Sequence, residues 1–149
     1  MDVTVNKTTN TLKFNFKALF NANEQYSSHD ENGNNLGDGA TNLFTRILSD
    51  DTSVIADIIK VAGGFGKVSN DDLFDAVDAI TEDGSKIDDV LSELKDELKN
   101  SGFFLKSITT QRDQLAKALT ILNGKEQTEE LKQQVSVVEN ILKLLNENL

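Results

Sequence analysis

Apolar residues near the N-terminus alternate with polar ones, and this pattern constrains the fold more than any other. The alternating apolar positions are Val3, Val5, Leu12, Phe14 and Phe16. A period of two is typical of a strand with one buried face. We therefore expect strands over residues 3–6 and 11–16, joined through the polar link 7–10 as an antiparallel hairpin, with a helix following through Tyr26.

A two-stranded sheet is marginal in water unless helices cover its apolar face. Every segment after Tyr26 has the pattern of a helix or a loop. The sequence thus predicts an α+β, mainly α-helical fold. It would consist of an N-terminal β-hairpin packed by a bundle of short helices, followed by a long C-terminal αα-hairpin.

Four short amphipathic segments follow a loop of turn-forming residues at positions 27–39. Helices are expected over residues 40–48, 53–62, 69–80 and 86–100. Ser69 is a strong candidate for an N-cap, because two Asp residues follow it where the helix dipole is positive. The third helix should turn its apolar residues inward, namely Leu73, Phe74, Val77 and Ile80.

The last third contains two long helical patterns, at residues 103–122 and from about Glu126 onward, separated by Asn123-Gly124. In the second, apolar residues recur at heptad spacing, at Leu131, Val135, Val138, Leu142, Leu145 and Leu149. Two such helices joined by a short turn predict an antiparallel hairpin. We expect a boundary between residues 1–102 and residues 103–149, and a single continuous core is equally tenable.

The heptad seam has two interpretations. Buried against residues 103–122, it would simply be core, which is how amphipathic helices usually pack. Alternatively, it would bind a partner helix or a second copy of the chain. The candidate partner-binding residues are Leu131, Val135, Val138, Leu142 and Leu145.

The net charge of −10 is unevenly distributed. Residues 1–68 hold 8 acidic and 6 basic residues, residues 69–101 hold 11 and 3, and residues 102–149 hold 6 of each. A phosphate-backbone binder needs a basic stripe, so we expect no nucleic-acid partner. The acidic middle either is a solvated surface or faces a basic partner.

No apolar run approaches the roughly 18 residues of a membrane span, and the polar start of the chain lacks a signal-peptide pattern. We therefore expect the host cytoplasm as its location and no membrane partner. The absence of Cys excludes disulfides, thiolate metal sites and Cys nucleophiles.

Two loops contain incomplete ligand motifs. Residues 30–34 have the oxygen spacing of an EF-hand loop, but Asn35 replaces the turn glycine and Thr41 the bidentate Glu. Residues 63–66 are glycine-rich, but they follow a helix and lack the Lys-Ser/Thr of a phosphate-binding loop. We expect no metal and no cofactor.

Catalysis is not expected either. His29 is the single imidazole, and no nucleophile motif accompanies it. The many carboxylates lie at solvent-facing helix positions, whereas an acid–base pair needs one desolvated acid. The remaining function is interaction with other proteins.

The order of these segments resembles that of the tail assembly chaperones of long-tailed phages and prophages of Gram-positive hosts. The resembling features are the hairpin of residues 3–16 running into a helix, a glycine-bearing loop, and the segments Asn42–Leu48, Val54–Ile59, Ser69–Val77 and Ile87–Phe104. The resemblance extends to about Gly102 and is carried by order and pattern. The long loop at residues 28–39 and the extension at 103–149 depart from it.

The resemblance implies a non-enzymatic helper encoded between the genes for the tail tube and the tape measure, commonly made in a short and a frameshifted longer form. Such a protein would coat the tape measure protein, keep it soluble, help recruit tail tube subunits, and be absent from the mature virion. Two alternatives remain open: a small structural connector or adaptor of a virion or bacterial complex, and an acidic nucleic-acid mimic that inhibits a DNA-binding protein.

Overall fold

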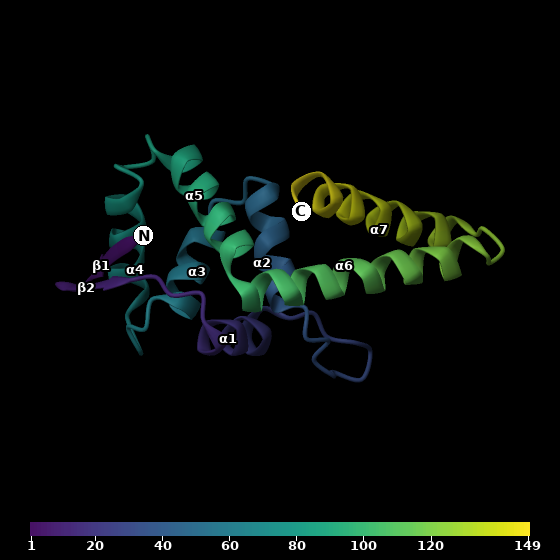
Figure 1. Cartoon of the computed structure of the whole chain (residues 1–149), viewed down its shortest axis with the longest axis horizontal. Helices are drawn as coiled ribbons and strands as arrows, with labels where there is room; N and C mark the ends of the chain where they lie inside the picture. Colours follow the sequence, from purple (N-terminus) through teal and green to yellow (C-terminus); the bar gives the residue numbers. More distant parts are fainter.

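The computed structural model describes all 149 residues and contains one two-stranded sheet and seven helices (Figure 1). The elements are β1 (Asp2–Val5), β2 (Thr8–Thr11), α1 (Phe16–Tyr26), α2 (Gly39–Leu48), α3 (Val54–Ala62), α4 (Asn70–Ile80), α5 (Ile87–Asn100), α6 (Gly102–Asn123) and α7 (Glu129–Asn148). The predicted fold class is confirmed: a mainly helical α+β chain with an N-terminal hairpin and a C-terminal αα-hairpin.

The hairpin turn falls earlier than predicted. β1 pairs antiparallel with β2, with Val5 opposite Thr8. The turn is therefore Asn6-Lys7, whose φ angles are 45° and 70°. Positive φ at both central residues is the backbone of a two-residue turn, whose twist matches that of the flanking strands. The predicted second strand at residues 11–16 was wrong, because β2 ends at Thr11.

Phe16 was expected on the buried face of that strand, and this prediction was also wrong. It is the first residue of α1, and its side chain is 61% exposed. Asn15 is the N-cap of α1, and its side-chain oxygen accepts a hydrogen bond of 3.0 Å from the Ala18 amide. This cap ends the extended segment before Phe16, so the alternation stops there. Leu12 is buried as expected, and Phe14 is half-buried.

One continuous core of 24 buried residues joins the hairpin, the short helices and the base of the C-terminal hairpin. β1 contributes Val3 and Val5, and α4 packs on this strand. Phe104 and Ile108 of α6 and Leu145 of α7 belong to the same cluster. The hydrophobic core is therefore continuous across residue 102, where a boundary was expected.

α4 faces the core differently from its prediction. Its buried residues are Leu73 and Ala76, whereas Phe74 is 54% exposed and lines an open groove between α3 and α4. Consecutive residues of a helix are about 100° apart, so Phe74 cannot share the face on which Leu73 meets the core. The predicted N-cap is confirmed, because the Ser69 hydroxyl accepts a hydrogen bond of 3.1 Å from the Asp72 amide.

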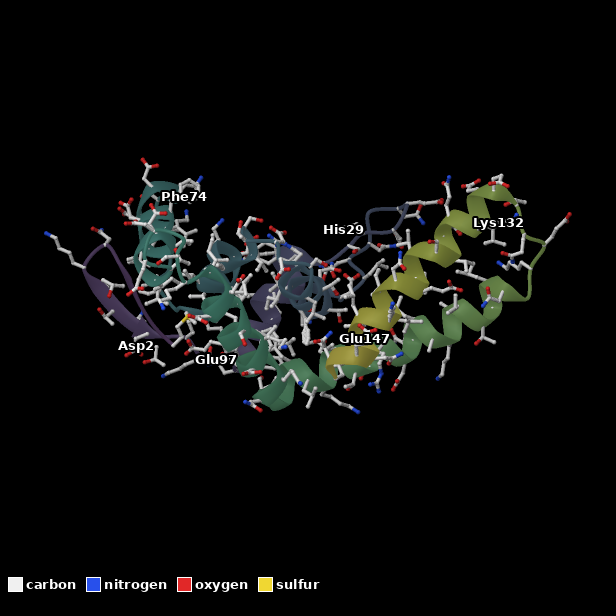
Figure 2. All side chains as sticks on the ribbon, turned by 90° about the horizontal axis from the view of Figure 1, so that it is seen from above. Asp2, His29, Phe74, Glu97, Lys132 and Glu147 are labelled. Carbon is white, nitrogen blue, oxygen red and sulfur yellow. The ribbon has the colours of Figure 1, made fainter.

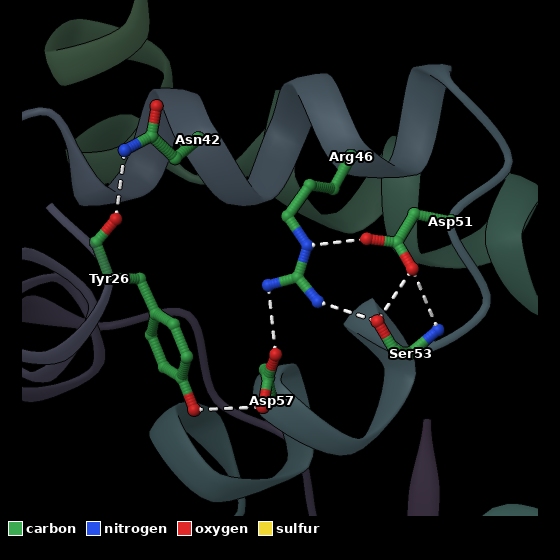
Figure 3. Close-up of polar contacts among 6 residues, drawn as sticks. All are labelled: Tyr26, Asn42, Arg46, Asp51, Ser53 and Asp57. Carbon is green, nitrogen blue, oxygen red and sulfur yellow. Dashed lines mark hydrogen bonds and ion pairs between the residues drawn. The ribbon is translucent and has the colours of Figure 1, made fainter. Parts of the chain in front are cut away.

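A polar network joins α1, α2 and α3 (Figure 3). The guanidinium of Arg46 pairs with the carboxylates of Asp51 at 2.7 Å and Asp57 at 2.8 Å. The Tyr26 hydroxyl donates a hydrogen bond of 2.9 Å to Asp57. Burial, together with this hydrogen bond, raises the pKa of Tyr26. The three helices are thus fixed to one another around a single cation.

None of the seven helices combines the length and the apolar character that a membrane crossing requires.

Candidate functional site

The heptad seam of α7 faces α6, as expected for an αα-hairpin. Val135, Leu142 and Leu145 are buried, while Leu131 and Val138 are half-buried. The C-terminal end of α7 also meets α2 (Figure 1), which completes the cover over the seam there. The structure therefore brings the five candidate partner-binding residues onto one face and covers three of them with the chain itself. Partner binding by this seam stays a prediction.

The remainder of the hairpin projects from the body as an arm (Figure 1), with Lys132 near its tip (Figure 2). The buried residues of α6, Phe104 and Ile108, both lie in its first two turns. Farther along the arm, Ile121 of α6 is 63% exposed and Val137 of α7 is 58% exposed. Two helices alone cannot cover each other completely, so the arm displays apolar surface.

Three phenylalanines form an exposed patch where α1 meets the start of α6. Phe16, Phe20 and Phe103 are 61%, 55% and 50% exposed, and we call them the aromatic patch. The rings of Phe16 and Phe103 meet edge to face with centroids 5.7 Å apart. Phe20 follows one turn after Phe16 on the same side of α1. Exposed aromatic side chains grouped in this way make the patch a candidate interaction surface.

The patch is held in place by a joint beneath it. The Ser101 hydroxyl donates a hydrogen bond of 2.7 Å to the Phe14 carbonyl oxygen and accepts one of 3.2 Å from the Phe104 amide, which caps α6. The rings of Phe14 and Phe104 meet edge to face inside the protein at 5.5 Å. Because Phe103 and Phe104 are about 100° apart on α6, one ring enters the core and the other faces solvent.

Beside the patch, α1 and α6 enclose an open groove of about 630 Å³. It is lined by Leu19, Gly102, Phe103, Lys106, Ser107, Thr110 and Gln111. Leu19 and Phe103 give it an apolar wall, and the other lining residues form a polar rim that contains no carboxylate. This combination suits a helix that presents one apolar stripe between polar flanks.

Sequence reasoning missed the aromatic patch, because Phe16 was assigned to a strand and Phe103 was treated only as the start of a long helix. Two local signals point to it. Asn15 has the character of an N-cap, which moves Phe16 from a strand to a helix. The Ser101-Gly102 pair likewise begins a helix, which places two adjacent aromatic residues on different sides.

The incomplete EF-hand segment is organised by its own hydrogen bonds. The Asp30 carboxylate accepts hydrogen bonds of 2.9 Å from the amides of Asn32 and Asn34, and one of 3.1 Å from the Asn34 side chain. The hydrogen bonds from Asn34 are the main reason that the pKa of Asp30 is lowered. His29 forms an isolated bridge with Asn35 in the same loop. No group of three or more His, Asp or Glu residues is placed to hold a metal ion.

The fold is a mainly helical, acidic body that carries an exposed aromatic patch. The chain belongs to the phage tail assembly chaperone family, because the family described as phage tail assembly chaperone protein, TAC, matches residues 2–112. The match includes all three residues of the aromatic patch and ends within α6. Among curated proteins and among solved structures, nothing matches the chain significantly.

Proposed function

We propose that this chain is a non-catalytic chaperone of phage tail assembly that binds the tape measure protein, keeps it soluble and helps recruit tail tube subunits around it. Membership of the tail assembly chaperone family supports the assembly role. The client, the tube recruitment, the action in the host cytoplasm and the absence from the mature virion are parts of the proposal.

The aromatic patch is the observation that carries this proposal. A tape measure protein prone to coiled coils exposes apolar helix stripes until it is assembled. Fully burying a Phe side chain contributes roughly 1.5–3 kcal/mol, and covering the exposed half of each patch residue contributes about half of that. The patch and the adjoining groove together offer Phe16, Phe20 and Phe103 to one such stripe, with Lys106 at the rim to pair with an acidic flank.

The charge of the chain supports the same role. Of its net charge of −10, residues 69–101 carry −8, and they include all of α4 and α5. Several copies bound along one client would keep this acidic surface in solvent, and its like charges would repel those of neighbouring loaded clients. A client coated in this way stays dispersed, although its own helices are apolar.

The seam of α7 is proposed as a secondary contact. Because Val135, Leu142 and Leu145 are covered by the chain itself, a client helix reaches them only when α7 separates from α6. The outer side of the arm, with Ile121 and Val137, is accessible without that separation. The aromatic patch is therefore the first site to test.

Co-expression with the tape measure protein of the same phage is the direct experiment. We expect the client to move into the supernatant fraction and to co-purify with the chain. The double variant Phe16→Ser/Phe103→Ser should lose both effects while remaining folded, because both side chains are largely exposed. Phe74→Ser is the matched control, since Phe74 is similarly exposed at 54% but lies on α4.

Unchanged client solubility together with no complex would refute the proposed function. Equal binding by the patch variant and by the control would move the client site elsewhere, with the arm and the seam next in order. Finding the chain at stoichiometric levels in purified virions would instead favour the structural connector.

A further inference from the structure

A basic cleft lies on the other side of α1 from the aromatic patch. It has a volume of about 720 Å³ and runs between β2, α1 and the glycine-rich segment after α3. Four lysines line it, and none of its lining residues is acidic. These lysines are Lys13, Lys17, Lys60 and Lys67, all exposed and none paired with a carboxylate. We call this feature the lysine cleft.

The lysine cleft is positively charged, whereas the chain as a whole carries a negative net charge. Residues 1–68 hold six basic residues, and four of them line this cleft. Four unpaired ammonium groups around one cavity repel one another, and a bound anionic group would relieve that repulsion. The cleft is thus a site for negative charge on a protein whose net charge is −10.

The free edge of the sheet forms one wall of the cleft. The Leu12 amide donates a hydrogen bond to the Met1 carbonyl oxygen, so this pair is hydrogen-bonded across the hairpin. Hydrogen-bonded and non-hydrogen-bonded pairs alternate along an antiparallel ladder. Thr9 and Thr11 therefore belong to non-hydrogen-bonded pairs, and their amide and carbonyl groups point away from β1.

One contact confirms this direction. Lys13 lies two residues after Thr11, so its amide points to the same side of the strand as the amides of Thr9 and Thr11. The Lys13 amide donates a hydrogen bond of 2.9 Å across this outer edge to the Ala62 carbonyl oxygen. Thr9 and Thr11 themselves make no backbone hydrogen bond outside the hairpin, and both line the cleft. An open strand edge with outward-facing amides and carbonyls is a template for a further strand.

We infer that the lysine cleft binds an extended acidic segment of a partner protein, which adds a third strand to the free edge of β2 while Lys13, Lys17, Lys60 and Lys67 hold its carboxylates. The strand edge would pair only with an extended backbone, and the lysines would favour a segment that carries negative charge. This site differs from the aromatic patch, and the inference does not depend on which client that patch binds.

Charge also selects a protein segment over a nucleic acid. A nucleic acid longer than the cleft would carry its negative charge onto the rest of a chain whose net charge is −10. A short acidic segment places all of its charge inside the cleft. Its backbone can also form the alternating amide and carbonyl hydrogen bonds of an antiparallel ladder with Thr9 and Thr11, which the backbone of a nucleic acid cannot form.

The test uses labelled peptides of about eight residues in which Glu alternates with Thr, a length that spans an ordinary strand. We expect the Glu peptide to bind the full chain at least about tenfold more tightly than a Gln analogue, with an affinity that falls as salt is added. Lys13→Gln/Lys67→Gln should lose at least about tenfold in affinity, whereas Lys117→Gln/Lys143→Gln, which removes the same charge from the arm, should not.

Backbone pairing is tested on the peptide, so that the protein remains unaltered. The Glu peptide is N-methylated at alternate residues in either of two registers, which leaves the charge unchanged. We expect the two peptides to differ at least about tenfold, because only one register of amides faces β2. Equal affinity of the two would overturn strand addition, and equally tight binding of an oligothymidine would overturn the choice of a protein partner.

The cleft variant also separates this inference from the proposed function. Lys13→Gln/Lys67→Gln should still solubilise the tape measure protein, because the aromatic patch is intact. Loss of peptide binding with client binding retained supports two separate sites. Normal peptide affinity in this variant would contradict the assignment of the acidic segment to the cleft, whether or not the variant still binds the client.

Discussion

The Ser101 hydroxyl donates a hydrogen bond of 2.7 Å to the carbonyl oxygen of Phe14, 87 residues earlier in the chain. The same hydroxyl caps α6 through the Phe104 amide. One side chain therefore fixes the exit of the N-terminal hairpin to the start of the long helix. The exposed pair Phe16 and Phe103 is positioned by this joint.

Removing that joint should destabilise the protein without a change in its surface. Ser101→Ala loses the cap and the hydrogen bond to Phe14, at a cost of about 1–2 kcal/mol in the free energy of unfolding. Ser101→Thr retains a hydroxyl and should cost less. Urea unfolding monitored by circular dichroism measures both, and equal stability of the Ala variant and the wild type would contradict this role.

Gly39 allows α2 to approach α1 closely. A Cβ atom at this position would lie 2.0 Å from the Ala22 carbonyl oxygen. Gly39→Ala should therefore push the two helices apart and cost about 1–3 kcal/mol. Gly102→Ala is the matched control, because a Cβ there meets nothing within 4 Å and the residue lies in the first turn of α6. Thermal unfolding should show a loss for the first variant only.

The hairpin turn leaves room for a stabilising change. Lys7 has a φ of 70°, which a glycine adopts without strain. Lys7→Gly creates the Asn-Gly pair that such turns favour and should add up to about 1 kcal/mol of stability. Lys125→Gly, in the loop between α6 and α7 where φ is not positive, should add none. A loss of stability in Lys7→Gly would argue against this turn.

The environment of Asp51 predicts that the stability of the fold depends on pH. Hydrogen bonds from Ser53, with the Arg46 guanidinium next to them, lower the pKa of this carboxyl group. A lowered folded-state pKa means that the ionised group stabilises the fold above its usual pKa and that this stabilisation is lost as the pH falls through the folded value. Asp51→Asn should thus be less stable than the wild type at pH 7, with the difference shrinking as the pH falls below the ordinary Asp pKa of about 3.9.

Urea unfolding of both proteins across this pH range measures that difference. Because both proteins share all other acidic groups, their general loss of stability in acid cancels in the comparison. A difference that stays constant down to the lowest pH would show that the Asp51 charge contributes nothing.

Variants in α7 can show whether its heptad seam is part of the core or a binding site for the client. Leu142 is 7% exposed, whereas Val137 on the same helix is 58% exposed. Leu142→Asp buries a charge against α6 and should cost several kcal/mol, on the order of 3–5, releasing α7 to protease. Val137→Asp should stay within about 0.5 kcal/mol of the wild type. If Leu142→Asp remained folded but lost the client, the seam would be a binding face instead of core.

Local pattern was enough to predict most of the helices. Within α2, α3 and α5 the apolar residues recur at helical spacing, and this periodicity is set by the backbone alone. The Ser69 cap was equally predictable, because a capping side chain acts within three residues of itself. The heptad seam of α7 was recognised for the same reason, although its spacing could not show what covers it.

The hairpin marks the limit of that reasoning. Alternation predicted an N-terminal hairpin and the buried side chains of Val3, Val5 and Leu12, which the structure contains, although the second strand lies earlier than predicted. The same alternation continues through Phe16, so it could not show where β2 ends. That end depends on the Asn6-Lys7 turn and on the Asn15 cap, which compete locally with strand formation.

The sequence by itself determined the helices, their caps, the acidic middle and the order of elements shared with tail assembly chaperones, because each depends on residues close together in the chain. Only the tertiary structure decided which apolar residues remain uncovered. Phe16 and Phe103 come from opposite ends of the matched region, and the four cleft lysines come from two stretches far apart in the chain, residues 13–17 and 60–67. Burial depends on which elements pack together, and that packing is decided by contacts between residues far apart in the chain.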